Sequence, residues 1–277
     1  MACTNGIPYG IGTSTDPAGD LWTGKNYTPR ALSKAKDKNN KTEKDRAKII
    51  VDFFSGKKFN ETGSTLPKEF GYAVAGVWSA ESSISPWRFN KDEQENGFAF
   101  RDIHAPNAKT FKYGGTTYYM DQANMMKFGY GKGLAQWSWS RVLKFRDWYN
   151  SPEGTKTPGV DIDDCASAIT ATSVTTQTAF AWKEMQERTG EFKRQIESIE
   201  TADPNTDKEK FDRNIILAVD AILRGYENGG KATMRTPHGD GKNDKKGMDS
   251  YDWDGGYEGA LRKRVEKALG VYEALKT

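Results

Sequence analysis

The stretch that decides the fold is AVAGVWSAESS, residues 73–83. Its spacing predicts a short amphipathic helix, because Val77 and Trp78 share one helix face with Glu81. Burial against apolar neighbours disfavours a charged carboxylate, so we expect the pKa of Glu81 to be raised. A carboxylic acid that keeps its proton near neutral pH can act as a general acid. The alternative is that Glu81 is a structural partner at a helix end.

A second motif follows about fifty residues later and reads GYGKGLAQWSWSR, residues 129–141. Gly131 and Gly133 would allow close backbone approach to a ligand. The amide of Gln136 can hydrogen-bond an acetamido group or a hydroxyl, and Trp137 offers a flat apolar face to a sugar ring. The alternative is a helix start with Trp137 in the core. The predicted substrate-binding residues are Tyr130, Gly131, Gly133, Gln136 and Trp137.

Hydrophobic periodicity predicts helices along most of the chain. The pattern Thr-x-x-Asp at Thr42 is typical of a helix N-terminus, and Gly56 ends the apolar repeat that follows. The next helix begins near Pro67 and carries Glu81 close to its end. Further helices are expected at 139–149, at 163–189 with a cap at Asp163 or Asp164 and an end at Gly190, at 207–226, and at 256–275.

Between these helices the period changes and short strands are expected. Residues 98–100 predict one strand, and residues 111–119 predict a hairpin that turns at Gly114-Gly115. The fold class is therefore α+β, mostly helical, with a small β-hairpin next to the helix that carries Glu81. We expect an irregular N-terminal arm over 1–40 and one domain over 41–277. That domain contains a loop rich in Gly, Asp and Lys at 229–256.

Composition excludes several classes of protein. The 277 residues include 41 basic and 38 acidic side chains, a net charge of +3 that is too balanced for a nucleic-acid-binding protein. No stretch approaches the roughly 18 apolar residues of a membrane span. The first residues lack the pattern of a secretory signal, so we expect no export by that route. Aromatic residues make up 12% of the chain, enough for a core and for exposed platforms that contact sugars.

The cysteines and histidines do not indicate a metal or redox site. Cys3 and Cys165 are too few for a disulfide framework in a chain of this length. His104 and His238 lack the spacing of a zinc site, and the Asp-rich loop misses the EF-hand pattern. We therefore expect no cofactor and no metal. Cys165 with His238 leaves a cysteine amidase or endopeptidase as a rival chemistry.

Taken together, the motifs resemble those of the bacteriophage tail lysozymes, within the lysozyme-like superfamily. Residues 74–82 with Pro86 are similar to the family's catalytic helix, and residues 129–141 resemble its glycine-rich Ala-Gln-Trp block. Farther along, QTAFAWKEM at 177–185 is similar to the next helix of the family. Ile222–Asn228, Arg262 and Ala268 resemble its closing elements, so the resemblance covers about 45–275 in order.

The resemblance implies cleavage of the β-1,4 bond between N-acetylmuramic acid and N-acetylglucosamine in peptidoglycan. It implies that Glu81 is the proton donor and that residues 131–137 line the glycan cleft. The implied partners are peptidoglycan strands and, through the arm, other tail or baseplate proteins. The implied location is the virion, with assembly in the infected host cytoplasm and action on the host cell wall. A lysis endolysin, a lytic transglycosylase and a non-catalytic glycan-binding tail protein are the alternatives.

Three features depart from the family pattern. The stretch between Glu81 and Gly131 is long, the usual Gly-Asn ahead of the acid reads Val77-Trp78, and the loop 229–256 looks inserted. The second catalytic carboxylate is therefore open. Asp102 is preferred, because an aspartate beside a strand could face the acid across a cleft. The other candidates are Asp121, Glu93 and Glu95, and each could equally be a solvated loop charge. Glu227 is expected to pair with Arg262 or Arg141.

Overall fold

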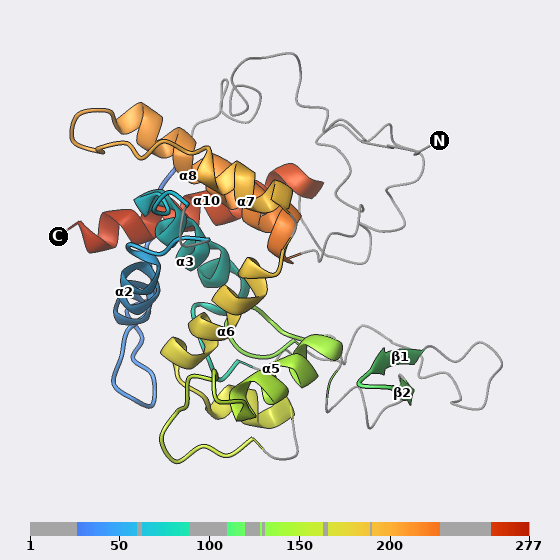
Figure 1. Ribbon diagram of the computed structural model, residues 1–277. Coiled ribbons are helices and arrows are strands. Elements are labelled where there is room, and N and C mark those ends of the chain that lie inside the picture. Colours follow the sequence, from blue (N-terminus) through green and yellow to red (C-terminus); the bar gives the residue numbers. More distant parts are fainter. Residues whose placement is uncertain are drawn as a thin grey trace, which may run out of the picture. The chain divides into compact units, whose positions relative to one another are not determined.

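Helices dominate the structure, a computed structural model, and the described part holds one two-stranded antiparallel sheet (Figure 1). This confirms the prediction of a mostly helical α+β fold with a small hairpin. The structure describes residues 27–59, 63–88, 110–119, 128, 131–162, 166–188, 190–227 and 256–276. The predicted strand at 98–100 and nearly all of the loop at 229–256 lie outside these residues.

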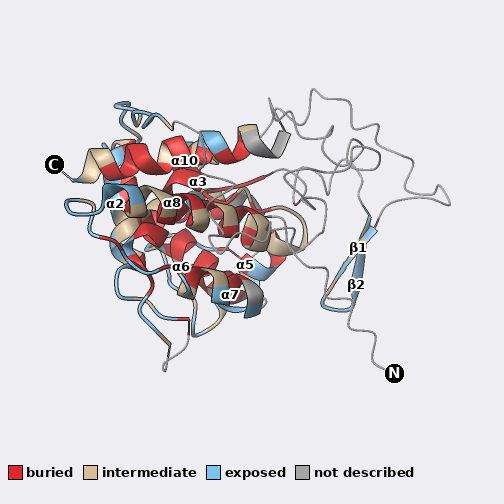
Figure 2. Cartoon of the chain, turned by 90° about the horizontal axis from the view of Figure 1, so that it is seen from above, coloured by how far each residue is buried: buried red, intermediate tan, exposed pale blue. Residues whose placement is uncertain are grey.

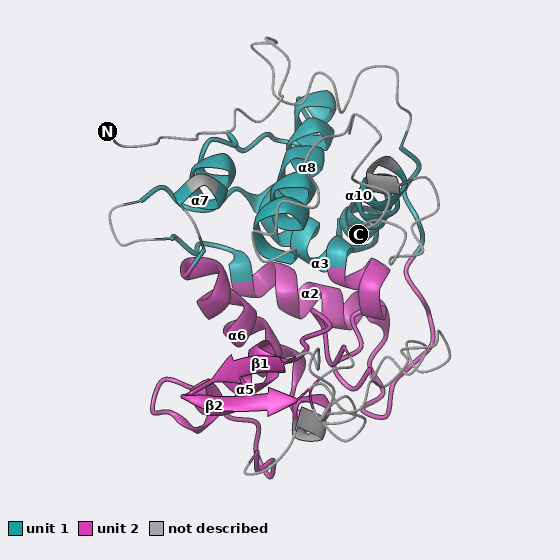
Figure 3. Cartoon of the chain, turned by 90° about the vertical axis from the view of Figure 1, so that its right-hand side faces the viewer, with its two compact units in different colours: residues 1–31, 54–77, 188–277 teal, residues 32–53, 78–187 magenta. Residues whose placement is uncertain are grey.

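The chain divides into two compact units (Figure 3). Unit 1 comprises residues 1–31, 54–77 and 188–277, and unit 2 comprises residues 32–53 and 78–187. The boundary between them falls inside helix α3, Lys68–Ser82, after Val77. Unit 2 therefore contains Glu81 and the whole glycine-rich motif.

Unit 1 consists of helices that pack together through buried aromatic and apolar side chains. Its other elements are α7 (Gly190–Glu197), α8 (Lys208–Ile222), the π-helical turn η4 (Leu223–Glu227) and α10 (Gly256–Leu275). Helix α8 packs against α10, and buried residues run along both (Figure 2). The ring of Phe211 lies 6.0 Å from Tyr72 and 4.6 Å from Tyr272. A Cβ at Gly76 would come within 2.4 Å of Ala268, so glycine permits α3 to approach α10 closely.

Unit 2 holds the remaining elements. These are α2 (Glu43–Phe54), β1 (Thr110–Tyr113), β2 (Thr116–Tyr119), α5 (Ser140–Asn150), the 3-10 helix η3 (Ala166–Ala171) and α6 (Val174–Gln186). Phe180 on α6 packs within the aromatic core of this unit. Its ring lies 4.8 Å from Phe145, 5.3 Å from Trp148 and 5.6 Å from Trp137. These four aromatic rings therefore serve packing.

The hairpin forms as the sequence predicts. Phe111 pairs with Tyr118, and Gly114 and Gly115 turn the chain with φ angles of 53° and 79°. Both angles lie in the left-handed region that a tight hairpin turn requires. The Tyr113 hydroxyl donates to the Asp147 carboxylate at 2.5 Å and so fastens the hairpin to α5.

The start signal predicted at Thr42 is confirmed. Before α2, the Asp45 carboxylate accepts the backbone N–H of Thr42 at 2.7 Å, and Thr42 Oγ1 accepts the N–H of Asp45 at 3.3 Å. This reciprocal arrangement is a capping box. The hydrogen bonds that the Thr42 backbone N–H and hydroxyl donate to the carboxylate lower the pKa of Asp45. Before α8, the Asp207 side chain accepts the N–H of Lys210.

The prediction of a single helix over 163–189 is wrong. Helix α6 begins only after Ser173, whose hydroxyl accepts the N–H of Thr176 at 3.1 Å, and a 3-10 helix precedes it. Gly190 begins α7 rather than ending a helix. Serine offers the backbone a cap that competes with helix continuation, and this signal outweighs the apolar periodicity. The predicted caps Asp163 and Asp164 lie outside the described residues.

The described end of the predicted arm makes specific contacts. In unit 1, the Arg30 guanidinium binds the Glu266 carboxylate of α10 at 2.6 Å. In unit 2, the N–H of Ser33 donates to the buried carboxylate of Glu43 at 2.5 Å.

Among the described residues, no helix combines the length and apolar composition needed to cross a membrane.

We expect the Tyr113 phenol to contribute a stability that is lost at high pH. Burial and the hydrogen bond to Asp147 raise the pKa of Tyr113 to about 12 from the usual 10.0. The folded chain then holds this proton more tightly than the unfolded chain does, so the contribution is complete below pH ~10 and disappears toward pH ~12. Urea unfolding across this range should show the decline, and Tyr113→Phe should reduce it. An equal decline in both proteins would contradict the assignment.

Candidate active site

Glu81 lies on the last turn of α3, at the edge of a buried helix. Val77 and Trp78, one turn earlier, are fully buried, whereas Glu81 is half-buried. The side chain therefore has apolar neighbours on its own helix and an exposed portion. A carboxyl group at the junction of core and solvent can meet a ligand without being fully hydrated.

The turn after Glu81 is strained. Ser83 and Ile84 have φ angles of 54° and 51°, in the left-handed region. A β-branched residue is an outlier there, and such conformations cost about 1–3 kcal/mol each. The Ile84 side chain is completely buried, which offsets part of that cost by about 1.5–3 kcal/mol.

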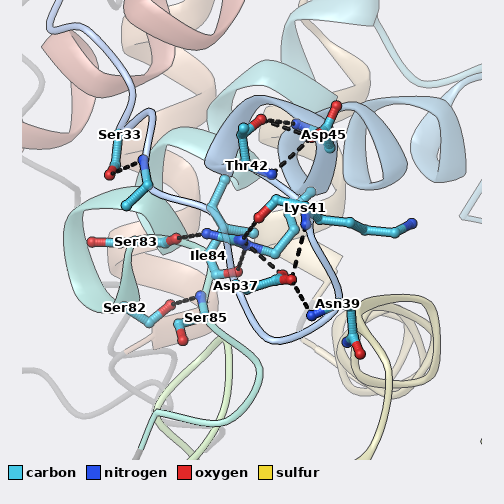
Figure 4. Close-up of polar contacts among 12 residues, drawn as sticks. Ser33, Asp37, Asn39, Lys41, Thr42, Asp45, Ser82, Ser83, Ile84 and Ser85 are labelled. Atoms are coloured by element: carbon cyan, nitrogen blue, oxygen red, sulfur yellow. Dashed lines mark hydrogen bonds and ion pairs between the residues drawn. The ribbon is translucent and has the colours of Figure 1, made fainter.

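Arg46, on α2, holds this turn from the side. Its Nε donates to the Ile84 carbonyl at 2.7 Å and its Nη2 to the Ser83 carbonyl at 3.2 Å. Its Nη1 donates to the Asp37 carboxylate at 2.9 Å and to the Lys41 carbonyl at 2.8 Å (Figure 4). The guanidinium thus joins the segment before α2 to the end of α3.

The Asp37 carboxylate that binds this cation is itself held by backbone hydrogen bonds. Burial raises the pKa of Asp37, but hydrogen bonds from the Lys41 and Asn39 backbone and from Arg46 outweigh it and lower the pKa below 3.8. Asp37 is therefore ionised at neutral pH and neutralises the guanidinium. A cation near a helix C-terminus is also stabilised by the negative end of the helix dipole.

The glycine-rich segment forms a closed loop beside this helix end. Lys132 and Trp137 form a β-bridge, with N···O distances of 3.0 and 2.9 Å in its two hydrogen bonds. Ser82 Oγ lies 2.9 Å from the Trp78 carbonyl and 3.2 Å from the Leu134 carbonyl. The residue directly after Glu81 therefore contacts the loop, and the two motifs meet across 52 positions of sequence.

Gln177 on α6 connects both segments, and the sequence reasoning missed it. Its Oε1 accepts the N–H of Leu134 at 2.8 Å, while its Nε2 lies 2.9 Å from the Pro86 carbonyl and 2.8 Å from the Ile169 carbonyl. The side chain is fully buried. Its position three residues before Phe180 on the apolar face was the available signal, since a buried amide must find partners.

The prediction that Trp137 presents a face to a sugar is wrong, and the alternative of a core residue is correct. Its ring is completely buried and its Nε1 donates to the Glu184 carboxylate at 2.8 Å. The guanidinium of Arg141 binds the same carboxylate at 2.7 Å. The indole therefore anchors the loop to α6. Of the two arginines expected to pair with Glu227, Arg141 thus binds Glu184, and Arg262 contacts Glu266 in unit 1.

The two glycines serve internal packing. A Cβ at Gly133 would lie 2.4 Å from Gln177 Oε1, and one at Gly131 would lie 2.7 Å from Gln136 Oε1. The space that was expected to admit a ligand is thus filled by protein side chains, which corrects the prediction. Gln136 is half-buried and its Nε2 donates to the Gly133 carbonyl at 2.7 Å.

Several predicted site residues lie outside the described residues. They are Tyr130, Asp102, Asp121, Glu93, Glu95, Cys3, Cys165, His104 and His238. Within the part that the structure describes, no group of three or more His, Cys, Asp or Glu residues could hold a metal ion.

Comparison with known proteins gives one match. A family model described as phage tail lysozyme matches residues 45–268. This range contains most of α2, the helix with Glu81, the glycine-rich loop and Gln177. No curated protein and no solved structure matches the chain.

We expect Gly133→Ala to destabilise the protein much more than Gly159→Ala. The two glycines have nearly equal φ angles of 71° and 72°, but a Cβ at Gly159 meets nothing within 4 Å. Gly159→Ala should therefore cost only the left-handed strain of about 1–2 kcal/mol. Gly133→Ala adds a clash with the buried Gln177 amide. Urea unfolding measures both, and equal losses would contradict a packing role for Gly133.

Proposed function

The chain belongs to the phage tail lysozyme family, and on that premise we propose that it hydrolyses bacterial peptidoglycan. The bond cleaved is the β-1,4 linkage between N-acetylmuramic acid and N-acetylglucosamine. The observation that carries the proposal is the position of Glu81. Glu81 is half-buried on the last turn of a mostly buried helix, and the next residue, Ser82, contacts the loop 131–137.

Glu81 acts as the general acid in this proposal. Its carboxyl group donates a proton to the glycosidic oxygen as the bond from that oxygen to the anomeric carbon breaks. The sugar passes through an oxocarbenium-like transition state. Val77 and Trp78, one helical turn before Glu81, are completely buried. In the proposed mechanism, apolar neighbours of this kind favour the protonated form that the step requires.

Asp102 is the proposed second carboxylate. It would stabilise the cation or orient the attacking water, and the separation of the two carboxyl groups would decide between inversion and retention of configuration. Tyr130 and the half-buried Gln136 are proposed to contact the glycan. The carbonyl oxygen of the Gln136 side chain suits an N–H donor such as that of an acetamido group.

We place the enzyme on the virion, at the tail or baseplate, where local opening of the cell wall would aid penetration. Its partners there are peptidoglycan strands and neighbouring tail proteins. The N-terminal arm is the proposed contact with those proteins, and residues 41–277 form the proposed catalytic domain with the inserted loop 229–256. The family match supports both the hydrolase role and the link to the tail.

Glu81→Gln should abolish glycan cleavage while preserving the fold. Glutamine keeps the shape of the side chain but has no proton to donate, and general acids contribute about 10²- to 10⁴-fold to rate. New reducing ends released from purified sacculi measure the activity. Glu153→Gln, an exposed site in the same unit, should match the parent. No cleavage by the parent, or equal cleavage by parent and Glu81→Gln, would defeat the mechanism.

The nature of the products separates the alternatives. Products with 1,6-anhydro ends would indicate a lytic transglycosylase. Binding to sacculi without cleavage would indicate a glycan-binding tail protein. New free amines that disappear in Cys165→Ser would indicate an amidase.

Asp102→Asn tests the second carboxylate. We expect a large fall in kcat with little change in KM, because the lost charge stabilises the transition state rather than the bound substrate. Parallel assays of Asp121→Asn, Glu93→Gln and Glu95→Gln provide matched controls. A fall confined to one of those three would reassign the role.

A further inference from the structure

We propose that Arg46 is a positioning residue, which holds the end of α3 so that Glu81 meets the glycosidic oxygen in reactive geometry. This inference rests on the proposed function of Glu81. Arg46 contacts neither Glu81 nor the glycan in the proposal. It acts through the backbone of Ser83 and Ile84, which follow Glu81 by two and three positions.

The strained turn creates the need for such a residue. Ser83 and Ile84 are non-glycine residues in the left-handed region, a conformation that persists only where the surroundings hold it. Their N–H groups donate to the Ser79 and Trp78 carbonyls of α3. Their carbonyls, which follow the last residue of the helix, accept from the Arg46 guanidinium at 3.2 and 2.7 Å, so Arg46 adds the restraint on this side of the turn.

The geometry of the guanidinium suits this task. A planar fork can bind several acceptors in fixed directions, whereas an ammonium group is a rotating point charge. Arg46 is only 5% exposed, and the ring of Trp87 lies 5.4 Å from its guanidinium carbon. The cation therefore has little freedom to move, and neither do the carbonyls that it binds.

Arg46 is itself held in place by the segment before α2. Asp37 accepts the N–H groups of Asn39 at 2.7 Å and Lys41 at 3.0 Å, and it binds Arg46 at 2.9 Å (Figure 4). The capping box at Thr42 then begins the helix that carries Arg46. The restraint on α3 thus extends from residue 37 to residue 46.

The turn also governs the contact with the glycine-rich loop. Ser82 Oγ reaches the Leu134 carbonyl at 3.2 Å, so relaxation of Ser83 and Ile84 would displace both Glu81 and this contact. Displacement of a catalytic group by ~1 Å can cost ~10²-fold in rate. A defect at Arg46 should therefore appear in catalysis well before substrate binding is lost.

The test compares Arg46→Met and Arg46→Lys with the parent on soluble peptidoglycan fragments, below the unfolding midpoint of every variant. Methionine keeps the apolar stem but removes all donors. We expect kcat to fall about 10- to 100-fold in Arg46→Met with KM changed less than about twofold. Arg46→Lys should recover part of kcat, because an ammonium group can still bind one or two of the acceptors.

A second-site variant makes the test specific to the turn. Ser83 is exposed, and Ser83→Gly removes the left-handed strain at that position. In the Arg46→Met background, Ser83→Gly should raise kcat severalfold, which a purely global stabilisation would not do at a temperature where both variants are folded. If Arg46→Met does not fold, Arg46→Lys with and without Ser83→Gly gives the same comparison.

A destabilised control separates position from stability. Asn214→Ala removes a buried hydrogen bond to Glu69 and a partly buried one to the Glu200 carbonyl in unit 1, so it should lower the unfolding midpoint while kcat stays near that of the parent. An unchanged kcat in Arg46→Met, with Glu81→Gln inactive, would overturn the positioning role alone. Activity that survives Glu81→Gln would overturn the proposed function and this inference together.

Discussion

Helix α3 ends on two left-handed residues without glycine, and hydrogen bonds from another helix add to the backbone hydrogen bonds of that turn. The guanidinium of Arg46 supplies these added bonds, from a helix that begins 39 residues before Ser82. The constraint reaches the site because Glu81 and Ser82 are the last residues of α3 before the turn. Ser82 in turn contacts the glycine-rich loop. The geometry around Glu81 therefore follows from the way this one helix ends.

Buried polar side chains give unit 2 a single arrangement. Glu43 accepts from Ser33 and Ser79, Gln177 from Leu134, and Glu184 from Trp137, with the partners separated by up to 47 positions. A buried polar atom that loses its partner costs about 1–3 kcal/mol. Alternative packings that would break these bonds are therefore disfavoured. The apolar core tolerates rearrangement more readily, since its contacts are not directional.

Local signals predicted the elements well. The capping box at Thr42, the glycines at 114–115 and the apolar repeat before Glu81 each act within a few residues, and each element formed as expected. The predictions that Trp137 and Gly133 are accessible to a ligand were wrong. Trp137 is buried, and Gly133 makes room for Gln177 rather than for a ligand. Residue type shows what a side chain can contact, whereas only packing shows which partner occupies the space.

By itself the sequence determined the fold class, the hairpin, the family and the two motifs that matter, because periodicity, turn residues and ordered motifs are properties of the chain. Tertiary structure decided that Ser82 meets Leu134, that Gln177 joins both segments and that Arg46 holds the turn after Glu81. The physical reason is that each of these bonds joins groups 37 to 91 positions apart. Their proximity arises only when the helices pack and bury the polar groups together.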